Sequence, residues 1–250
     1  MFYMTSNSMK KFIAILIVIL LSVNIFIYFN QEEKKEIIKN GEVVNIIFEK
    51  EAYIISQSNV YDVLARYPIV NEEINEKFKE LLFSQINSFK ELAEGNAEFI
   101  PDIENRRFIF DANYFIESFS EDIKSYAFTI STYSGGAHGY VDTITQTYNI
   151  RTGEVYELQD IVLDMDKFSQ VTKEKLLQVF ESRGGNYDEE WIDDGIDFNK
   201  KENYERFLIT NNSLIIYFPP YQVASYADGT IVTEIYFEEI KDIISSNFIK

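Results

Sequence analysis

The sequence predicts an α+β protein in which largely antiparallel sheets pack with two long helices. Strand-like runs rich in β-branched and aromatic residues occur in clusters along the 250 residues. Two long segments with apolar residues at helical spacing separate these clusters without a regular strand–helix alternation, which favours antiparallel over parallel pairing. A long apolar run near the start predicts that a transmembrane helix precedes the folded region.

The apolar run covers residues 12–29 and reads FIAILIVILLSVNIFIYF, interrupted only by Ser22 and Asn24. At about 1.5 Å per residue it extends roughly 27 Å, close to the ~30 Å of a hydrocarbon core. Lys10 and Lys11 precede the run, which favours an N-terminus inside the cell. The pattern therefore predicts a signal anchor.

A cleaved signal peptide is the alternative, because its apolar core also follows lysines. The run is longer than the about 7 to 15 residues usual for such a core, and no Ala-x-Ala-like site follows. We expect residues 1–11 in the cytoplasm, an anchor at 12–29, a tether at 30–42 and all later residues outside. This describes a single-pass protein of the cell membrane with an extracytoplasmic C-terminal domain.

The first cluster of predicted strands is EVVNIIFE, AYIISQS and NVYDVLARYP, and Pro68 closes it. An amphipathic helix is predicted from Asn71 onward, with Gly95 as the glycine that ends it. The residues expected on its buried face are Ile74, Phe78, Leu81, Leu82, Phe89 and Leu92.

Further strands are predicted in RRFIFDANYFIES, SYAFTISTYS and VDTITQTYNI, and Gly153 marks a hairpin turn. A second helix is predicted for Met165 to Arg183, with Asp164 or Asp166 as N-cap and Gly184 after its end. SLIIYF, a Pro-Pro turn, TIVTEIYF and a short helical tail complete the chain. The residues of the second helix expected to face inward are Phe168, Val171, Leu176, Val179 and Phe180.

Composition excludes several classes of function. The chain has no cysteine, which rules out disulfides, thiol catalysis, Cys-based zinc sites, iron–sulfur clusters and a lipidated cysteine. The net charge is −18, and −20 beyond the apolar run because Lys10 and Lys11 precede that run and no acidic residue does. Such a field repels nucleic acid and attracts basic proteins or cations. Simple solubility is the alternative reading of this charge.

The most distinctive motif is STYSGGAHGY, Ser131 to Tyr140, with three glycines and the only histidine. It lacks the lysine of a phosphate-binding loop, and its glycines indicate a tight connection between strands. One histidine cannot form a multi-histidine zinc site, so we predict no metal, no cofactor and no catalytic residue. A second aromatic segment, YFPPYQVASY, could contact a partner or stack on sugars. The candidate binding residues in the two segments are Tyr133, Gly135, Gly136, His138, Tyr140, Tyr221, Tyr226 and Asp228.

The acidic stretch DEEWIDDGID, Asp188 to Asp197, resembles a calcium loop at first sight. Its spacing does not fit an EF-hand, because Lys201 would replace the terminal bidentate glutamate. We interpret the stretch as a solvated acidic loop with Trp191 turned inward, and a weak cation site of another kind is the alternative.

Two longer segments resemble known extracytoplasmic domains. YSGGAHGYVDTITQTYNIRTGEVYELQDIV and FLITNNSLIIYFPPYQVASYADGTIVTEIYFEEI resemble the C-terminal domain of RsiV-type anti-sigma factors of Gram-positive bacteria. YPIVNEEINEKF resembles the domain that precedes it, which also occurs beside the catalytic module of PdaC-type peptidoglycan deacetylases. The resemblance covers about residues 43–244 and implies two subdomains, residues 43–115 and 116–246. Its most specific residues are Pro220, Tyr221, Ala224, Tyr226 and Gly229.

In RsiV-type proteins the corresponding region binds lysozyme, so the resemblance implies a lysozyme-type partner. With at most eleven residues expected inside the cell, a segment that holds a sigma factor is not expected, and neither is a deacetylase module. We therefore expect a non-enzymatic binding domain that acts as sensor, decoy or inhibitor of a basic protein such as lysozyme. The first alternative is a module that binds or scaffolds peptidoglycan glycans. The second is an envelope hydrolase that uses His138 with a carboxylate such as Asp142.

Overall fold

The computed structural model describes residues 41–100, 107–185 and 187–248. The predicted cytoplasmic segment, the anchor at 12–29 and nearly all of the tether lie outside these residues. Within the described ranges, every helix is too short or too polar to cross a membrane.

The described residues form two sheets, with helices packed against each. The larger sheet contains β1 (Val43–Ile47), β2 (Glu51–Gln57), β3 (Tyr61–Pro68), β4 (Phe108–Ser118), β5 (Ile123–Tyr133), β6 (Tyr140–Asn149) and β7 (Val155–Tyr156). The smaller sheet contains β8 (Phe207–Ile209), β9 (Ser213–Phe218) and β10 (Ile231–Tyr236). The α-helices are α3 (Glu72–Ala97), α4 (Leu158–Ile161), α5 (Met165–Ser182) and α6 (Glu189–Gly195). Three short 3-10 helices are η2 (Lys201–Tyr204), η3 (Tyr226–Asp228) and η4 (Ser246–Phe248).

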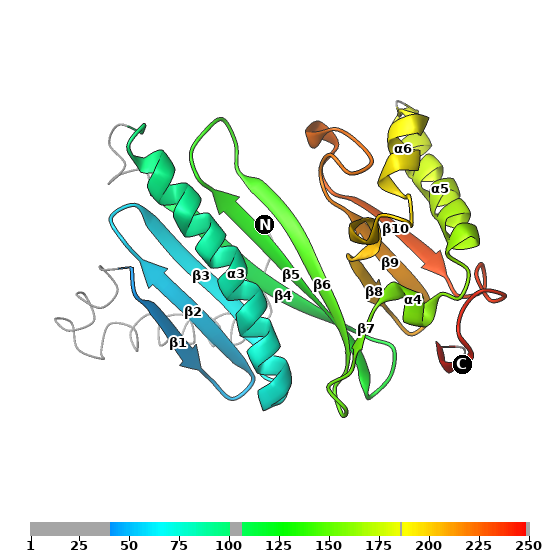
Figure 1. Ribbon diagram of the computed structural model, residues 1–250, viewed down its shortest axis with the longest axis horizontal. Coiled ribbons are helices and arrows are strands. Elements are labelled where there is room, and N and C mark those ends of the chain that lie inside the picture. Colours follow the sequence, from blue (N-terminus) through cyan, green and yellow to red (C-terminus); the bar gives the residue numbers. More distant parts are fainter. Residues whose placement is uncertain (1–40, 101–106, 186, 249–250) are drawn as a thin grey trace, which may run out of the picture.

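The strand order of the larger sheet is sequential from β1 to β7, and that of the smaller sheet is β10-β9-β8. All pairs are antiparallel except β3 with β4, which are parallel. Parallel neighbours require a crossover, and α3 provides it across one face of the sheet (Figure 1). The predicted α+β class with largely antiparallel sheets is therefore confirmed.

Helix α3 begins where the sequence predicts, because the Asn71 side chain accepts a hydrogen bond from the Ile74 N–H at 2.9 Å. Near its middle, Phe78 is fully buried and packs against three aromatic rings of the sheet. Those rings belong to Tyr126, Phe128 and Tyr148, with centroids 4.9, 5.2 and 5.7 Å from that of Phe78. Burial raises the pKa of Tyr126 to about 12, which keeps this core tyrosine neutral at physiological pH.

Two details of the α3 prediction are wrong. Leu92 is 53% exposed, because the buried stripe continues through Ile86 and Ala93 instead. The helix also runs past Gly95 to Ala97, since Gly95 keeps ordinary helical geometry. Beyond it, the Asn96 side chain donates to the Ser134 carbonyl at 2.8 Å, a tertiary contact that fixes the last turn.

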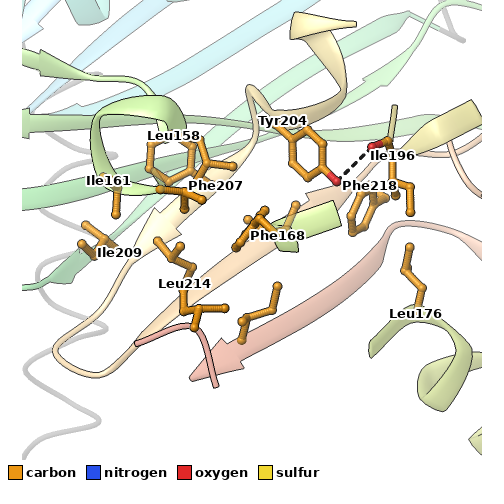
Figure 2. Close-up of a cluster of buried hydrophobic side chains, with 14 of the residues drawn as sticks. Leu158, Ile161, Phe168, Leu176, Ile196, Tyr204, Phe207, Ile209, Leu214 and Phe218 are labelled. Atoms are coloured by element: carbon orange, nitrogen blue, oxygen red, sulfur yellow. Dashed lines mark hydrogen bonds between the residues drawn. The ribbon is translucent and has the colours of Figure 1, made fainter. Parts of the chain in front are cut away.

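Helix α5 packs against the smaller sheet and forms the second core, part of which Figure 2 shows. Of the two N-cap candidates, Asp164 is the residue that caps, because its carboxylate accepts from the Lys167 N–H at 3.0 Å. Gly184 follows the helix with a φ of 115°, as predicted. Phe168, Leu176 and Phe180 are buried as expected, whereas Val171 and Val179 pack at the margin of this core.

Strand β8 of the smaller sheet packs on the face of β5 and β6 that lies opposite α3. There the Ser125 hydroxyl lies 2.7 Å from that of Thr147 and accepts a hydrogen bond from the Ile209 N–H of β8 at 2.9 Å. The predicted boundary between residues 115 and 116 falls inside β4. Hydrogen bonding of the sheet is therefore continuous across it, and the division into 43–115 and 116–246 stays a prediction.

Candidate functional site

The two segments predicted to bind a partner form loops on the same side of the molecule, at the top of Figure 1. The β5–β6 loop, residues 134–139, joins two long antiparallel strands. Gly135 and Gly136 have φ values of 91° and 104°, a conformation that side chains disfavour. The prediction that these glycines supply a tight connection is confirmed. The β9–β10 loop, residues 219–230, connects the two strands that carry most of the smaller sheet.

The two loops touch through His138 and Tyr226. The two rings are stacked, with centroids 4.1 Å apart and planes at 24°. The Tyr226 hydroxyl also donates a short hydrogen bond to the Gly139 carbonyl, which links residues 87 positions apart. The structure thus brings predicted site residues from distant segments into one place.

Two further aromatic residues extend this contact. The Tyr221 ring lies 5.9 Å from that of Tyr226, with planes at 35°. The Trp191 indole N–H donates to the Tyr221 carbonyl at 3.1 Å. We call His138, Tyr226, Tyr221 and Trp191 the aromatic row.

Tyr221 holds a strained position in this row. Its φ is 72°, the only positive φ of a non-glycine residue in the described ranges, and its side chain is 62% exposed. A bulky residue in this region costs of order 1–3 kcal/mol and persists where surrounding contacts hold it. Here the Tyr221 N–H donates to the Ala224 carbonyl at 2.9 Å and closes a tight turn. The fold therefore tolerates strain that presents a large ring to solvent.

Gln222 attaches the β9–β10 loop to the end of α6 and to η2. Its side-chain amide donates to the carbonyls of Gly195 and Asn203 at 2.8 and 2.9 Å. The backbones approach so closely that a Cβ atom at position 195 would lie 2.1 Å from the Gln222 carbonyl oxygen. A side chain at position 195 would therefore prevent the β9–β10 loop from packing this closely.

The acidic stretch from Asp188 forms a helix, α6, and the expectation of a loop is wrong. The Asp188 carboxylate accepts from the Glu190 and Trp191 N–H groups at 3.0 and 3.2 Å and caps it. Trp191 is 37% exposed and part of the aromatic row, whereas Ile192 fills the core. An N-cap aspartate followed by glutamates in the first turn is the signal that would have indicated the helix.

The remaining predicted residues support the loops. The Tyr133 hydroxyl donates to the Gly136 carbonyl at 3.3 Å, within the β5–β6 loop. The Asp228 carboxylate accepts from the Ser225 hydroxyl at 2.6 Å and closes the turn at η3. Tyr140 is 40% exposed at the start of β6. The burial of the rest of its side chain raises the pKa of its hydroxyl, and the negative charge of Asp142 raises this pKa further.

His138 and Asp142, the pair named for the hydrolase alternative, have separate hydrogen-bond partners. The His138 Nδ1 lies 3.1 Å from the Gly139 carbonyl oxygen. The Asp142 carboxylate is bound by the Arg206 guanidinium at 3.0 and 3.2 Å, and by the Thr143 N–H at 2.8 Å. Over the described part of the chain, no three histidine or acidic side chains gather closely enough to hold a metal ion.

Comparison with known proteins finds similarity to one domain family and to one curated protein. Residues 159–238 match the family model described as a protein of unknown function, DUF3298. The chain is 23% identical, over 248 residues, to the peptidoglycan-N-acetylmuramic acid deacetylase PdaC of Bacillus subtilis strain 168. That alignment covers 96% of this chain and 51% of PdaC, so the chain spans about half the length of this curated relative.

Two solved structures are similar to this chain. A DUF3298 family member from Bacteroides fragilis aligns with a TM-score of 0.54 and 15% identity, over 82% of this chain and 92% of that chain. A DUF3298 family protein from Pseudomonas aeruginosa PAO1 aligns with a TM-score of 0.49 and 14% identity, over 83% and 95%. The first likeness shows a shared fold.

These findings confirm the predicted relationship to PdaC- and RsiV-type domains. Residues 159–238 are similar to the DUF3298 family, and the chain over nearly its whole length is similar to PdaC. Within the aromatic row, Trp191, Tyr221 and Tyr226 lie inside the matched range, whereas His138 precedes it. The row therefore joins the matched segment to strands β5 and β6 before it.

Proposed function

We propose that this chain, which is similar to the DUF3298 family and to PdaC, is a binding protein of the cell envelope that recognises a basic extracellular protein such as lysozyme. The observation that carries the proposal is the aromatic row, in which rings from two loops and α6 meet on one side of the molecule. In this role the chain acts as a sensor, decoy or inhibitor, and it has no catalytic activity of its own.

The aromatic row has the properties of a protein-binding surface. Tyrosine and tryptophan offer large rigid faces with a polar tip, and they are enriched among the residues that dominate binding energy. Gln222 and Gly195 fix the β9–β10 loop, and Gly139 ties Tyr226 to the β5–β6 loop. A partner would then bind without a large cost for ordering these side chains.

Charge supports a basic partner. The chain carries a net charge of −18, and α6 brings acidic residues directly beside Tyr221 through the Trp191 hydrogen bond. The exposed acidic residues of this helix and its cap are Asp188, Glu189, Glu190, Asp193 and Asp194. Lys173 and Lys200 pair with only some of them, so the helix keeps an excess of negative charge. Such a field speeds encounters with a positively charged protein.

The location and the absence of catalysis are further parts of the proposal. The apolar run at 12–29 would anchor the chain in the membrane with the described residues outside. The name of PdaC, a peptidoglycan deacetylase, supports a setting at the cell wall. The engagement of Asp142 by Arg206 supports a binding role over hydrolysis that uses His138.

Binding to peptidoglycan glycans is the second candidate, because exposed tyrosine and tryptophan faces also stack on sugar rings. The Tyr221 ring, 62% exposed at the end of a strained turn, favours it most directly. Ionic strength separates the two candidates. Attraction between a basic protein and an acidic surface weakens with salt, whereas stacking on a neutral glycan changes little.

The proposal is tested by calorimetric titration of the full chain, in mild detergent, with a basic lysozyme at low and near-physiological salt. We expect a Kd of about 1 µM or tighter at low salt and weaker binding as salt rises. Glu190→Lys should weaken binding, because Glu190 lies on α6 beside the aromatic row. Glu121→Lys, an exposed change between β4 and β5, is the matched control and should have little effect.

Salt-independent binding of neutral peptidoglycan fragments, without lysozyme binding, would favour the second candidate. Absence of heat with both ligands would contradict both proposals.

A further inference from the structure

Strand β1 forms one outer edge of the larger sheet. It pairs with β2 from Val43 opposite Ser56 to Ile47 opposite Ala52. Among the residues that the structure describes, no strand pairs with its other side. The outer side of β1 therefore presents backbone groups that another strand could use.

The pairing with β2 determines which backbone groups point outward. Phe48 N–H donates to the Glu51 carbonyl at 2.9 Å, so these two residues form a hydrogen-bonded pair. Such pairs alternate along an antiparallel ladder, which directs Val44 and Ile46 toward β2. The N–H and C=O groups of Val43, Asn45 and Ile47 therefore point away from the sheet.

The edge lacks the features that usually protect such strands. Natural edge strands carry charges, proline or bulges that discourage pairing. Strand β1 reads VVNII, without a charged residue or proline, in a chain with 26% charged residues. Val43 is 39% and Ile47 is 62% exposed. β1 is suited to pair with another strand.

We propose that β1 pairs antiparallel with β1 of a second copy of this chain, about a two-fold axis through Asn45. In this register Asn45 faces its own equivalent, and Val43 faces Ile47 of the second copy. The outward groups of both strands then meet in hydrogen-bonded pairs, because the three outward residues are symmetric about Asn45. The two sheets join into one continuous sheet with both α3 helices on the same face.

The charge pattern supports a second copy as the occupant. Two chains of net charge −18 repel each other, and this repulsion opposes association least where carboxylates do not face one another. In the proposed register, Glu42 lies opposite Phe48 of the second copy and Glu49 opposite Gly41. No like charges are paired across the axis. Strand β10, the outer edge of the smaller sheet, carries Glu234 in its centre and lacks this property.

The test uses the absence of cysteine from the chain, which allows a single thiol to be introduced. In the full chain in mild detergent, Asn45→Cys should form a disulfide-linked dimer under mild oxidation. Residues in a hydrogen-bonded antiparallel pair have Cα atoms about 5.5 Å apart, within the range that a disulfide spans. Asn211→Cys, an exposed position between β8 and β9, is the matched control and should cross-link at least tenfold less.

Charged residues introduced at positions 43 and 47 test the register itself. With Asn45→Cys present, Val43→Glu together with Ile47→Glu places like charges opposite each other and should reduce cross-linking at least tenfold. Val43→Lys together with Ile47→Glu places opposite charges there and should restore it. Circular dichroism of each variant checks that the fold is retained.

Equal cross-linking at positions 45 and 211, or the same yield in both charge variants, would overturn the self-pairing. A second result would also overturn the self-pairing. If Asn45→Cys alone does not cross-link, and Val43→Glu together with Ile47→Glu abolishes lysozyme binding, the edge belongs to the lysozyme interface. This outcome is separate from the proposed function, because the aromatic row lies at a different place on the molecule from β1.

Discussion

Replacement of Tyr226 by Ala is expected to weaken the binding of a basic lysozyme by roughly 30-fold or more, the effect of losing a dominant interface residue. Tyr226 stacks on His138, lies against Tyr221 and bonds the Gly139 carbonyl. Its removal therefore deletes one ring and also disconnects the two loops. Calorimetric titration at low salt measures the change in Kd.

Two matched variants show whether lysozyme binding depends on the Tyr226 ring and on its place in the aromatic row. Tyr226→Phe keeps the stacked ring and loses only the bond to Gly139, so it should bind with intermediate affinity. Tyr236→Ala removes an exposed tyrosine of β10 outside the aromatic row and should leave the Kd unchanged. Unchanged binding by Tyr226→Ala would remove the aromatic row from the proposed interface.

Replacement of Gly195 by Ala is expected to lower the free energy of unfolding by about 3 kcal/mol, at the upper end of typical overpacking costs. The added Cβ would lie 2.1 Å from the Gln222 carbonyl oxygen. This oxygen belongs to the backbone, so it cannot move aside by a rotamer change as the end of a flexible side chain could. The β9–β10 loop must shift, and Tyr221 and Tyr226 shift with it. Urea denaturation measures the stability, and lysozyme titration should show weaker binding.

Gly95→Ala is the matched control for this variant. Gly95 lies within α3 at ordinary helical φ, and apart from its chain neighbours and the nearby backbone of its own helix, no described atom lies within 4 Å of a Cβ placed there. Alanine loses less backbone entropy than glycine in a helix, so the free energy of unfolding should rise by about 0.5–1 kcal/mol. A neutral result for Gly195→Ala, or equal losses for both variants, would contradict the close contact at Gly195.

Local patterns predicted much of the fold. Asn71 and Asp164 mark the starts of α3 and α5, because a short polar side chain before an apolar stripe is a strong N-cap signal. The end of α3 was not predictable in the same way. A glycine near the end of a stripe usually stops a helix, but here α3 continues past Gly95, and Asn96 in the added turn contacts Ser134 of a distant loop.

The candidate site was predicted in parts and not as a whole. Glycines and aromatic residues identified both loops, yet the stacking of His138 on Tyr226 depends on how the two sheets meet. No periodicity in the sequence encodes a contact between residues so far apart. Trp191 was assigned to the interior because a large ring is usually buried, whereas Ile192 takes that place.

The central claim is that the β5–β6 loop and the β9–β10 loop form one binding surface, and hydrogen exchange tests it most directly. Backbone amides of the full chain are compared with and without saturating basic lysozyme at low salt. We predict slower exchange in both loops and in α6, with little change at the β4–β5 turn around Glu121. Protection confined to one loop, or found only away from the aromatic row, would contradict the claim.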